Sequence, residues 1–269
     1  MPSILLLHLG LTFYFGAVVL LFSAIRRGSR RLLGAGVCLS LVAGGAHAAV
    51  LFIRGGIPPT TLFDFALLLA SSVMFLGVAA DLVRGTRVLS VGCAPTALSF
   101  ALVATLVGAD GGPRPEKVLT PWATAHVLIM LVAFGALSLA FVGGMLFLFE
   151  QRKLKVRPTE TVLGLLPPLE TMYRMTIAGT AAGAALLTVG LIVGYLYART
   201  IETASNAWRT DPKVFLTTAT WLAYVLVTVG SFVPLLRGKR TAWASVVSFA
   251  LVLLAFWASA FWSPFHRYR

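Results

Sequence analysis

Residues 121–149 read PWATAHVLIMLVAFGALSLAFVGGMLFLF, a stretch with one histidine and no lysine, arginine, aspartate or glutamate. A helix needs about 20 mainly apolar residues to cross the hydrocarbon core of a bilayer, so this stretch predicts a membrane-spanning helix. An extended segment would leave its N–H and C=O groups unpaired in lipid. The alternating ten-residue segments of a membrane barrel do not occur in the sequence.

Apolar runs of similar length recur along all 269 residues. The chain is 58% hydrophobic and only 12% charged, about half the charged fraction of a typical soluble domain. We therefore predict an all-α fold, a polytopic membrane helix bundle of about eight transmembrane helices, in a single transmembrane domain over residues 1–269. The predicted spans are residues 3–25, 33–53, 61–80, 88–108, 121–149, 175–198, 214–236 and 242–262.

Lysine and arginine are shared unevenly between the two sets of alternate loops. One set holds 14 of them, in residues 26–32, 81–87, 150–174 and 237–241. The other set holds 8, in residues 54–60, 109–120, 199–213 and 263–269. Because positive charges favour the cytoplasmic side, the first set is predicted to be cytoplasmic and both termini extracytoplasmic.

This orientation predicts a multi-pass protein of the bacterial inner membrane. The segment 150–174 is expected to be a cytoplasmic connection, with a short amphipathic element over 158–174, and 199–213 an extracytoplasmic, tryptophan-bearing loop. The net charge of +13 does not indicate nucleic acid as a partner, since the basic residues lie in short loops where membrane topology and lipid headgroups account for them.

The four histidines of the chain all fall in the outer part of a predicted span or just beyond it. They are His8, His47, His126 and His266. Ionisable residues inside a membrane are costly and commonly functional, and imidazole is a common axial ligand of haem iron. Two other interpretations stay open: a hydrogen-bonded polar residue between helices for His8 and His47, and a water-facing histidine at the interface for His126 and His266.

Tryptophans accompany these histidines. Trp122 precedes His126 by four residues, which places both on one side of a helix. Trp208 lies in the outer loop, and Trp221 lies about two turns into the seventh span. The alternative interpretation is the ordinary aromatic belt of a membrane protein.

The outer loop also carries polar residues that fit the start of a helix. Asp211 is predicted to cap the seventh span, with Pro212 at its first position. A flat anionic porphyrin would require an aromatic surface, two imidazoles and cations for its propionates. Candidate cations, each of which is equally explained as a solvated loop charge, are Arg209, Lys213, Arg267 and Arg114.

Several of these segments together resemble the haem-handling cytochrome c assembly proteins, the CcsA, CcmC and HemX group. The resemblance covers roughly residues 44–269. It is carried by the ordered set Pro58-Pro-Thr-Thr-Leu-Phe-Asp64, Trp122-Ala-Thr-Ala-His126, Leu166-Pro-Pro-Leu-Glu170, Trp208-Arg-Thr-Asp-Pro-Lys213 with Trp221 and Tyr224, and Arg237-Gly-Lys-Arg240.

The resemblance implies that haem b is held by histidines and presented at the extracytoplasmic face for attachment to apocytochrome c. His126 and His266 would be the flanking ligands, and His47, with His8 as a partner, the intramembrane site. A second membrane biogenesis subunit would be required, and a role as part of a haem lyase or synthetase stays open.

In the outer loop, Trp208 is the only tryptophan before Asp211, and Val214 follows Lys213. This weakened form of the signature looks more like the HemX-type branch. Two alternatives therefore remain: regulation of haem synthesis by a HemX-type protein, and export of haem or a small molecule without ligase activity.

Overall fold

Eight long helices make up the computed structural model, which describes residues 2–55, 59, 61–84, 88–108, 120–156, 167–200 and 211–261. No strand occurs within those ranges. Each of the eight is long and apolar enough to cross a membrane, which confirms the predicted fold class. Their bounds are α1 Pro2–Arg27, α2 Arg30–Ile53, α3 Leu62–Arg84, α4 Val88–Val107, α5 Pro121–Val156, α6 Leu169–Thr200, α7 Pro212–Gly230 and α8 Lys239–Phe261.

The segment predicted as one span over 214–236 is divided. Helix α7 ends at Gly230, and a short 3-10 helix, η3, follows at Pro234–Leu236. Proline has no N–H to donate and disfavours a helical residue before it, so the apolar run continues while the helix does not. The predicted end of this span is therefore wrong by six residues.

Helices α5 and α6 both extend into the predicted connection 150–174. Helix α5 continues to Val156, and α6 begins at Leu169, directly after Pro167 and Pro168. Residues 169–174 were predicted to belong to a separate amphipathic element on the surface. That prediction is wrong for these residues, because they form the first turns of α6. The rest of that element, residues 158–166, lies outside the described residues.

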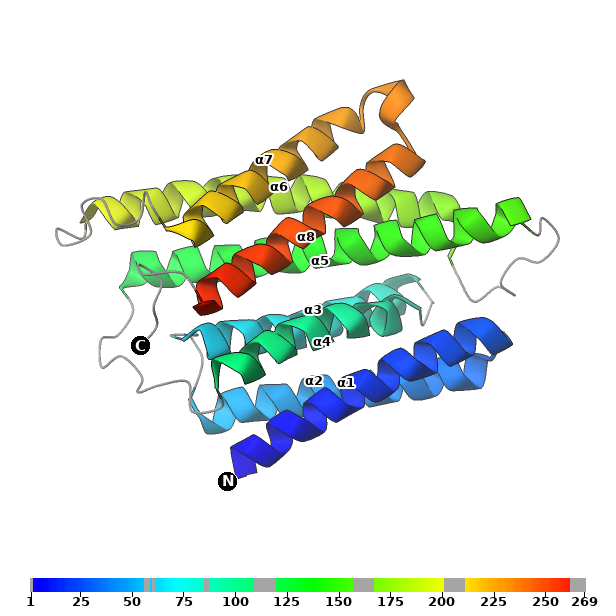
Figure 1. The fold of residues 1–269 in the computed structure, drawn as a ribbon, viewed down its shortest axis with the longest axis horizontal. Helices are drawn as coiled ribbons and strands as arrows, with labels where there is room; N and C mark the ends of the chain where they lie inside the picture. The colour runs from blue at the N-terminus through cyan, green and yellow to red at the C-terminus, as the bar shows by residue number, and fades with distance from the viewer. Residues whose placement is uncertain are drawn as a thin grey trace.

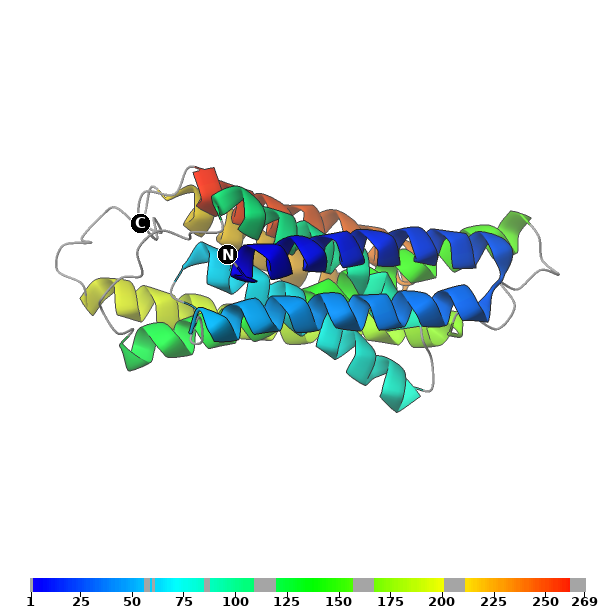
Figure 2. The ribbon, with the colours of Figure 1, turned by 90° about the horizontal axis from the view of Figure 1, so that it is seen from below.

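The helices form two layers (Figures 1 and 2). The pair α1–α2 lies at one edge, followed by α3–α4, then α5 with α8, then α6 with α7 at the other edge. Helices α1, α3, α5 and α7 all begin at the end of the bundle where α2, α4, α6 and α8 finish. We call this end the histidine end, because His8, His47 and His126 lie toward it, and the opposite one the basic end.

Phenylalanine rings fill the junction between α3–α4 and α5–α8. The Phe256 ring lies 4.9 Å from that of Phe100 and 5.3 Å from that of Phe134, measured between centroids. Phe249 stacks on Phe141 at 4.4 Å. These offset and edge-on arrangements are the favoured ones for aromatic pairs, so ring packing holds α8 against α4 and α5.

Small residues bring α6 close to α5. Gly179, Gly183, Gly190 and Gly194 lie at spacings of four, seven and four, on one face of α6. A Cβ atom at Gly179 would lie 2.9 Å from the Ala136 carbonyl oxygen, and one at Gly183 would lie 2.2 Å from Leu137 Cδ2. Membrane helices associate through such close packing of small residues, so this glycine face fixes the α5–α6 pair.

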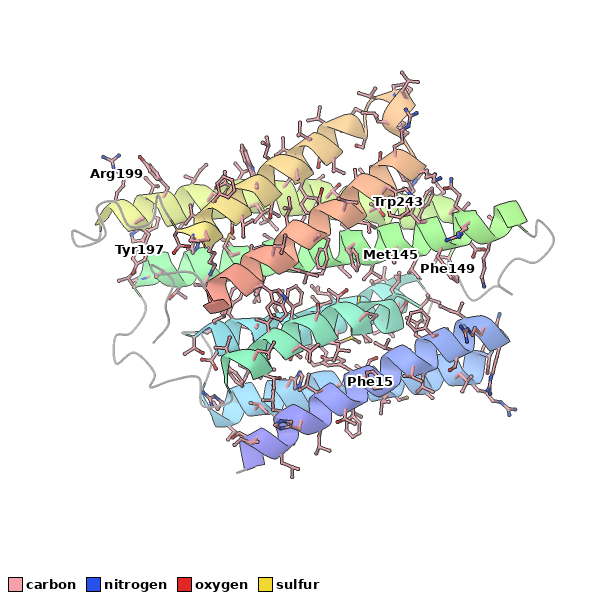
Figure 3. The ribbon with its side chains drawn as sticks, in the orientation of Figure 1. Phe15, Met145, Phe149, Tyr197, Arg199 and Trp243 are labelled. Carbon is pink, nitrogen blue, oxygen red and sulfur yellow. The ribbon has the colours of Figure 1, made fainter. Side chains whose placement is uncertain are left out.

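Large apolar side chains also cover the outside of the bundle. Phe15 and Leu226 are each 62% exposed, and Met145 and Trp243 about half exposed. Figure 3 draws these side chains along the outer surface, with Phe15, Met145 and Trp243 labelled. An apolar surface this extensive suits contact with lipid chains rather than with water.

The carboxylate of Asp81, near the end of α3, caps the start of α4. Its Oδ1 accepts the Leu89 N–H at 3.1 Å, and its Oδ2 accepts the Ser90 N–H at 2.8 Å and the Ser90 hydroxyl at 2.6 Å. The first N–H groups of a helix have no partner within it, so Asp81 satisfies two of them across the α3–α4 hairpin.

Asp81→Ala is expected to destabilise the protein by roughly 2 kcal/mol or more, because buried donors at the start of α4 lose their acceptor. Thermal unfolding in detergent, followed by circular dichroism, measures the effect. Glu170→Ala is the control, since Glu170 lies in an exposed ion pair with Arg174 in the first turn of α6 and such pairs contribute little. Equal melting temperatures for the two variants would contradict the capping role.

Arginines close the turn between α7 and α8 at the basic end. Arg237 donates through Nε to the Ser231 carbonyl at 3.1 Å, and Arg240 donates to the Leu235 carbonyl at 2.8 Å. The side chains of Phe232 and Leu235 are 70% and 78% exposed in the same turn. The turn thus presents apolar side chains outward while its carbonyl groups are satisfied by guanidinium groups.

Candidate functional site

The imidazole of His126 lies between the first turns of α5 and the last turns of α6. Its Nδ1 is 2.8 Å from the Gly190 carbonyl oxygen. A carbonyl only accepts, so Nδ1 must carry the proton in this contact, and Nε2 is then the nitrogen with the free lone pair. The hydrogen bond therefore assigns one tautomer and leaves Nε2 as the nitrogen that could ligate a metal.

Glycine makes this arrangement sterically allowed. A Cβ atom at Gly194 would lie 2.7 Å from Cε1 and 2.8 Å from Nδ1 of His126. The ring thus occupies the space that a side chain at Gly194 would need. The His126 ring is located by two glycines of α6, one as hydrogen-bond acceptor and one as a flat surface.

The start of α7 lies at the same end of the bundle as His126. Asp211 is buried, and its Oδ1 accepts the Lys213 N–H at 2.8 Å, with Pro212 at the first helical position. The predicted capping role of Asp211 is confirmed. Lys213 lies in the first turn of α7, at the same end of the bundle as His126. Asp211, Lys213 and His126 therefore all lie toward the histidine end.

Trp122 and Trp221, two tryptophans of the predicted site, lie within the described residues and have different surroundings. Trp122, in the first turn of α5, is 60% exposed. Trp221 is partly buried and donates its Nε1–H to the Thr188 hydroxyl at 2.8 Å, which ties α7 to α6. Trp221 therefore has a structural contact of its own, while the exposed Trp122 is available to a ligand or to lipid at the histidine end.

His47 is completely buried between α2 and α1. Its Nε2 is 3.2 Å from the Leu7 carbonyl oxygen, and its ring meets Tyr14 edge-on with centroids 5.3 Å apart. A Cβ atom at Gly10 would lie 2.3 Å from Nε2, so glycine is needed where α1 passes the ring. Within the described residues the buried Nδ1 has no hydrogen-bond partner.

His8 does not share the enclosed position of His47. It is exposed on α1, and its Nδ1 is 2.8 Å from the Ile4 carbonyl oxygen of the same helix. His47 and His126 are also apart, since one packs in the α1–α2 pair and the other in the α5–α6 pair (Figure 1). The described histidines therefore form no ligand pair with one another.

Part of the predicted site lies outside the described residues. This part comprises His266, Trp208 and Arg209, together with the candidate cations Arg114 and Arg267.

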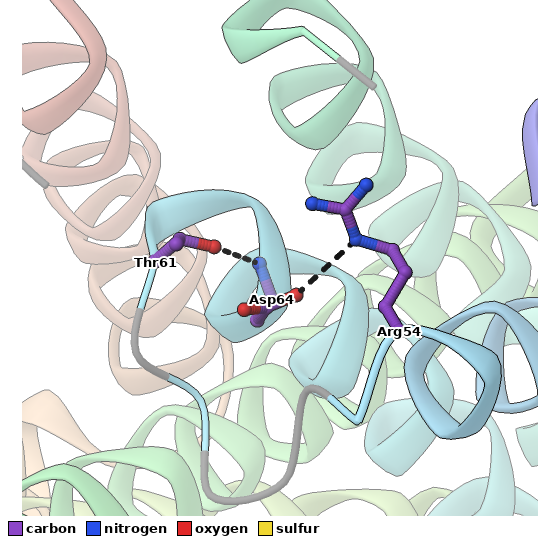
Figure 4. Close-up of polar contacts among 3 residues, drawn as sticks. All are labelled: Arg54, Thr61 and Asp64. Carbon is purple, nitrogen blue, oxygen red and sulfur yellow. Dashed lines mark hydrogen bonds and ion pairs between the residues drawn. The ribbon is translucent and has the colours of Figure 1, made fainter. Parts of the chain in front are cut away.

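A charged contact at the histidine end was missed by the sequence reasoning. Arg54, directly after α2, has its Nε 3.9 Å from Asp64 Oδ1 in the first turn of α3 (Figure 4). The Arg54 guanidinium also lies over the Phe63 ring, 4.7 Å from its centroid. Asp64 was noted only as part of a family motif. A sequence pattern could have predicted this pair: a single arginine in a short loop, followed by an aspartate in an apolar helix.

Eight apolar helices, with two described histidines packed between them and one exposed on α1, define a multi-pass membrane protein with imidazoles toward one end. The sequence profile of the cytochrome c assembly protein family matches residues 60–266. The chain therefore belongs to the cytochrome c assembly protein family, and its role lies in c-type cytochrome biogenesis.

Individual relatives agree with this family. The cytochrome c biogenesis protein CcsA of Gloeobacter violaceus is 22% identical, over 74% of each chain. CcsA of Guillardia theta is 21% identical, over 75% of this chain and 73% of its own. An uncharacterized 28.8 kDa protein of Azospirillum brasilense is 26% identical, over 70% of this chain and 68% of its own. No solved structure gave a significant match.

The matched region includes His126, His266 and the loop before α7, and it begins after α2. His8 and His47 thus lie outside the matched region. Their candidacy as haem ligands is therefore argued from the structure of the α1–α2 pair.

Proposed function

We propose that the protein binds haem b through histidines and presents it at the extracytoplasmic face of the bacterial inner membrane for attachment to apocytochrome c. The observation that carries the proposal is the His126 imidazole, whose Nδ1–H is bonded to the Gly190 carbonyl at the histidine end of the bundle. This end would be the extracytoplasmic one.

The residues present fit a haem iron. Histidines that ligate metals commonly donate their other ring N–H to a carbonyl, which fixes the tautomer and the ring orientation. His126 meets that condition before any metal binds, with Nε2 as the ligating atom. When bound, haem supplies the reactive porphyrin vinyl groups, and this chain's residues would hold and orient it. His266 is proposed as the second axial ligand and Trp208 and Trp122 as aromatic contacts, with Arg209 and Lys213 at the propionates.

His47 supports a second, intramembrane binding position. A buried nitrogen without a hydrogen-bond partner is costly in a protein interior, and a ligand that it coordinates would remove that cost. The ring is enclosed by α1 at Gly10, so binding there requires α1 to move away from α2. His8, exposed on α1, is the proposed partner for such an opened state.

The orientation is supported by the charges at the basic end. Arg26 and Arg27 end α1, Arg30 begins α2, and Arg237 and Arg240 close the α7–α8 turn. Cytoplasmic loops of membrane proteins carry such an excess of arginine and lysine. Apocytochrome c and a second membrane subunit of the biogenesis machinery are the proposed partners, and whether the assembly acts as a haem lyase depends on them.

A HemX-type role in regulating haem synthesis is the second candidate. It is favoured by the loop sequence, in which Trp208 is the only tryptophan before Asp211 and Val214 follows Lys213. The first role requires bound haem, so the first experiment measures haem binding.

Protein expressed with ample haem and purified in detergent is expected to show a Soret band, and pyridine haemochrome analysis is expected to give b-type haem. His47→Ala is expected to lower the haem content while a Soret band persists, because His126 would retain an outer site. Ser40→Ala is the matched control, as another fully buried polar residue of α2.

Wild-type protein that contains no haem under these conditions contradicts the proposal. A His47→Ala protein with unchanged haem content contradicts only the intramembrane position and leaves the outer site in place.

A further inference from the structure

Four arginines gather at the turn between α1 and α2, at the basic end of the bundle (Figure 1). Arg26 and Arg27 end α1, and Arg30 and Arg31 begin α2. We call these four residues the arginine cluster. All four are exposed, and within the described residues none of their guanidinium groups has an ion pair or a hydrogen bond. No acidic residue precedes Asp64 in the sequence, so neither helix of this hairpin supplies a carboxylate.

The turn itself is fixed by hydrogen bonds. Gly28 has a positive φ of 61°, and the Ser29 N–H donates to the Ala24 carbonyl at 3.1 Å, as at a helix end terminated by glycine. The Ser29 hydroxyl then accepts the Leu32 N–H at 3.4 Å and caps α2. Because Ser29 both closes α1 and starts α2, the two pairs of arginines are held on either side of a two-residue turn.

The positions of Arg30 and Arg31 are unfavourable without an anion. The N-terminus of a helix carries a partial positive charge, which favours acidic side chains in the first turn and opposes basic ones. The first turn of α2 contains no acidic residue. Like charges also repel one another across so short a turn. Membrane topology accounts for positive charge at this end, but it does not require two arginines at the start of a helix. An anion bound by the arginine cluster relieves both effects.

An exposed apolar face of α1 leads to the arginine cluster. Phe15, Val19 and Phe22 are 62%, 49% and 61% exposed, and Figure 3 labels Phe15 on the outside of the bundle. With Arg26 they follow one another at spacings of four, three and four residues, which places them on one face of the helix. From Phe15 to Arg26 the helix rises by about 16 Å, close to the roughly 15 Å of one leaflet of the hydrocarbon core. This face therefore has the length of a lipid acyl chain and ends in a cation.

We propose that the α1–α2 hairpin binds one anionic phospholipid, with its phosphates on the arginine cluster and its acyl chains along Phe15, Val19 and Phe22. Arginine binds phosphate oxygens through paired charge-assisted hydrogen bonds, and four or more basic residues beside a membrane helix are typical of anionic lipid sites. Four guanidinium groups suit a headgroup with two phosphates, such as that of cardiolipin. The site is independent of the proposed haem binding and lies at the opposite end of the bundle from His126.

Cardiolipin and phosphatidylcholine, added to delipidated full-length protein in a neutral detergent, provide the test. Native mass spectrometry counts the bound lipids, and thermal unfolding measures the stabilisation. One cardiolipin per chain is expected to be retained and to raise the melting temperature, whereas phosphatidylcholine and inorganic phosphate at the same phosphate concentration are expected to do neither. Arg26→Gln combined with Arg30→Gln is expected to weaken cardiolipin binding at least about tenfold. Lysine at both positions is expected to keep part of the affinity, because the charge remains while the paired hydrogen bonds are lost.

Arg152→Gln combined with Lys239→Gln is the matched control. Both residues are exposed at the basic end, on α5 and α8, and the double substitution removes the same charge. This control is expected to bind cardiolipin as the wild-type protein does. Because binding is measured in detergent, the influence of the arginines on membrane insertion does not enter the comparison. Circular dichroism and size-exclusion chromatography verify that each variant is folded.

A folded protein with Arg26→Gln and Arg30→Gln that binds cardiolipin as tightly as the wild type overturns the inference. Equal losses in this protein and in the control overturn it as well, since they would indicate attraction to the charge of the whole basic end. Stabilisation by inorganic phosphate as large as that by cardiolipin would mean that the apolar face of α1 does not contribute, and it overturns the assignment of a lipid.

Discussion

Gly179→Leu is expected to prevent formation of the folded eight-helix protein, with a loss of stability of about 3 kcal/mol or more. A Cβ atom at this position would lie 2.9 Å from both the Ala136 carbonyl oxygen and the Ala140 Cβ, and 3.0 Å from the Ala140 backbone nitrogen. Backbone atoms have no rotamer by which to move aside. The leucine would therefore separate α5 from α6 and displace Gly190 from His126. Size-exclusion chromatography and thermal unfolding in detergent measure the loss.

Gly45→Leu is the matched control for this prediction. Gly45 is also a helical glycine, on α2, and a Cβ atom there would meet nothing within 4 Å. The same substitution is expected to leave the elution profile and melting temperature nearly unchanged. A stable, monodisperse Gly179→Leu protein would show that α5 and α6 do not require this close approach.

His126→Ala is expected to weaken haem binding at the outer site by about a hundredfold or more. Loss of residues that merely support a metal ligand costs about 10–100-fold, and the ligand itself contributes more. The substitution leaves the α6 glycines in place, so the fold is expected to persist. Titration of haem into purified protein, carried out with His47→Ala present in every sample, isolates the outer site.

Two further variants test whether the loss of haem binding is specific to the His126 ring. Thr124→Ala, in the same part of α5, is expected to bind haem as its parent does. Gly194→Leu keeps the histidine but fills the space of its ring, where a Cβ atom would lie 2.7 Å from Cε1, and is expected to lose haem as His126→Ala does. Unchanged affinity in His126→Ala would remove this histidine from the site.

The number of helices could be predicted because membrane spans are set by length and apolar composition, as residues 121–149 illustrate. Helix ends were less predictable. Residues 231–236 are largely apolar, so hydropathy extended α7 through them, although Pro234 carried the signal for a break. At the start of α6, Glu170 and Arg174 lowered the hydropathy of a segment that is helical from Leu169.

The candidate site was predictable as a set of residue types and only partly as an arrangement. The cap at Asp211 followed from local rules, because a helix start is encoded in adjacent residues. The hydrogen bond from His126 to Gly190 spans 64 positions and depends on how α5 packs on α6. The isolation of His47 from His8 and the contact of Arg54 with Asp64 likewise depend on packing, which no local pattern encodes.

The closed turn between α7 and α8 affects how membrane orientation can be probed. Moving positive charges from one side of a membrane protein to the other is the usual way to invert its insertion, and Arg237 and Arg240 are natural choices. These guanidinium groups also donate to the carbonyls of Ser231 and Leu235. Removing them would leave those carbonyls without these donors at the bilayer surface, so the insertion of the last hairpin and its closure are expected to depend on the same two side chains.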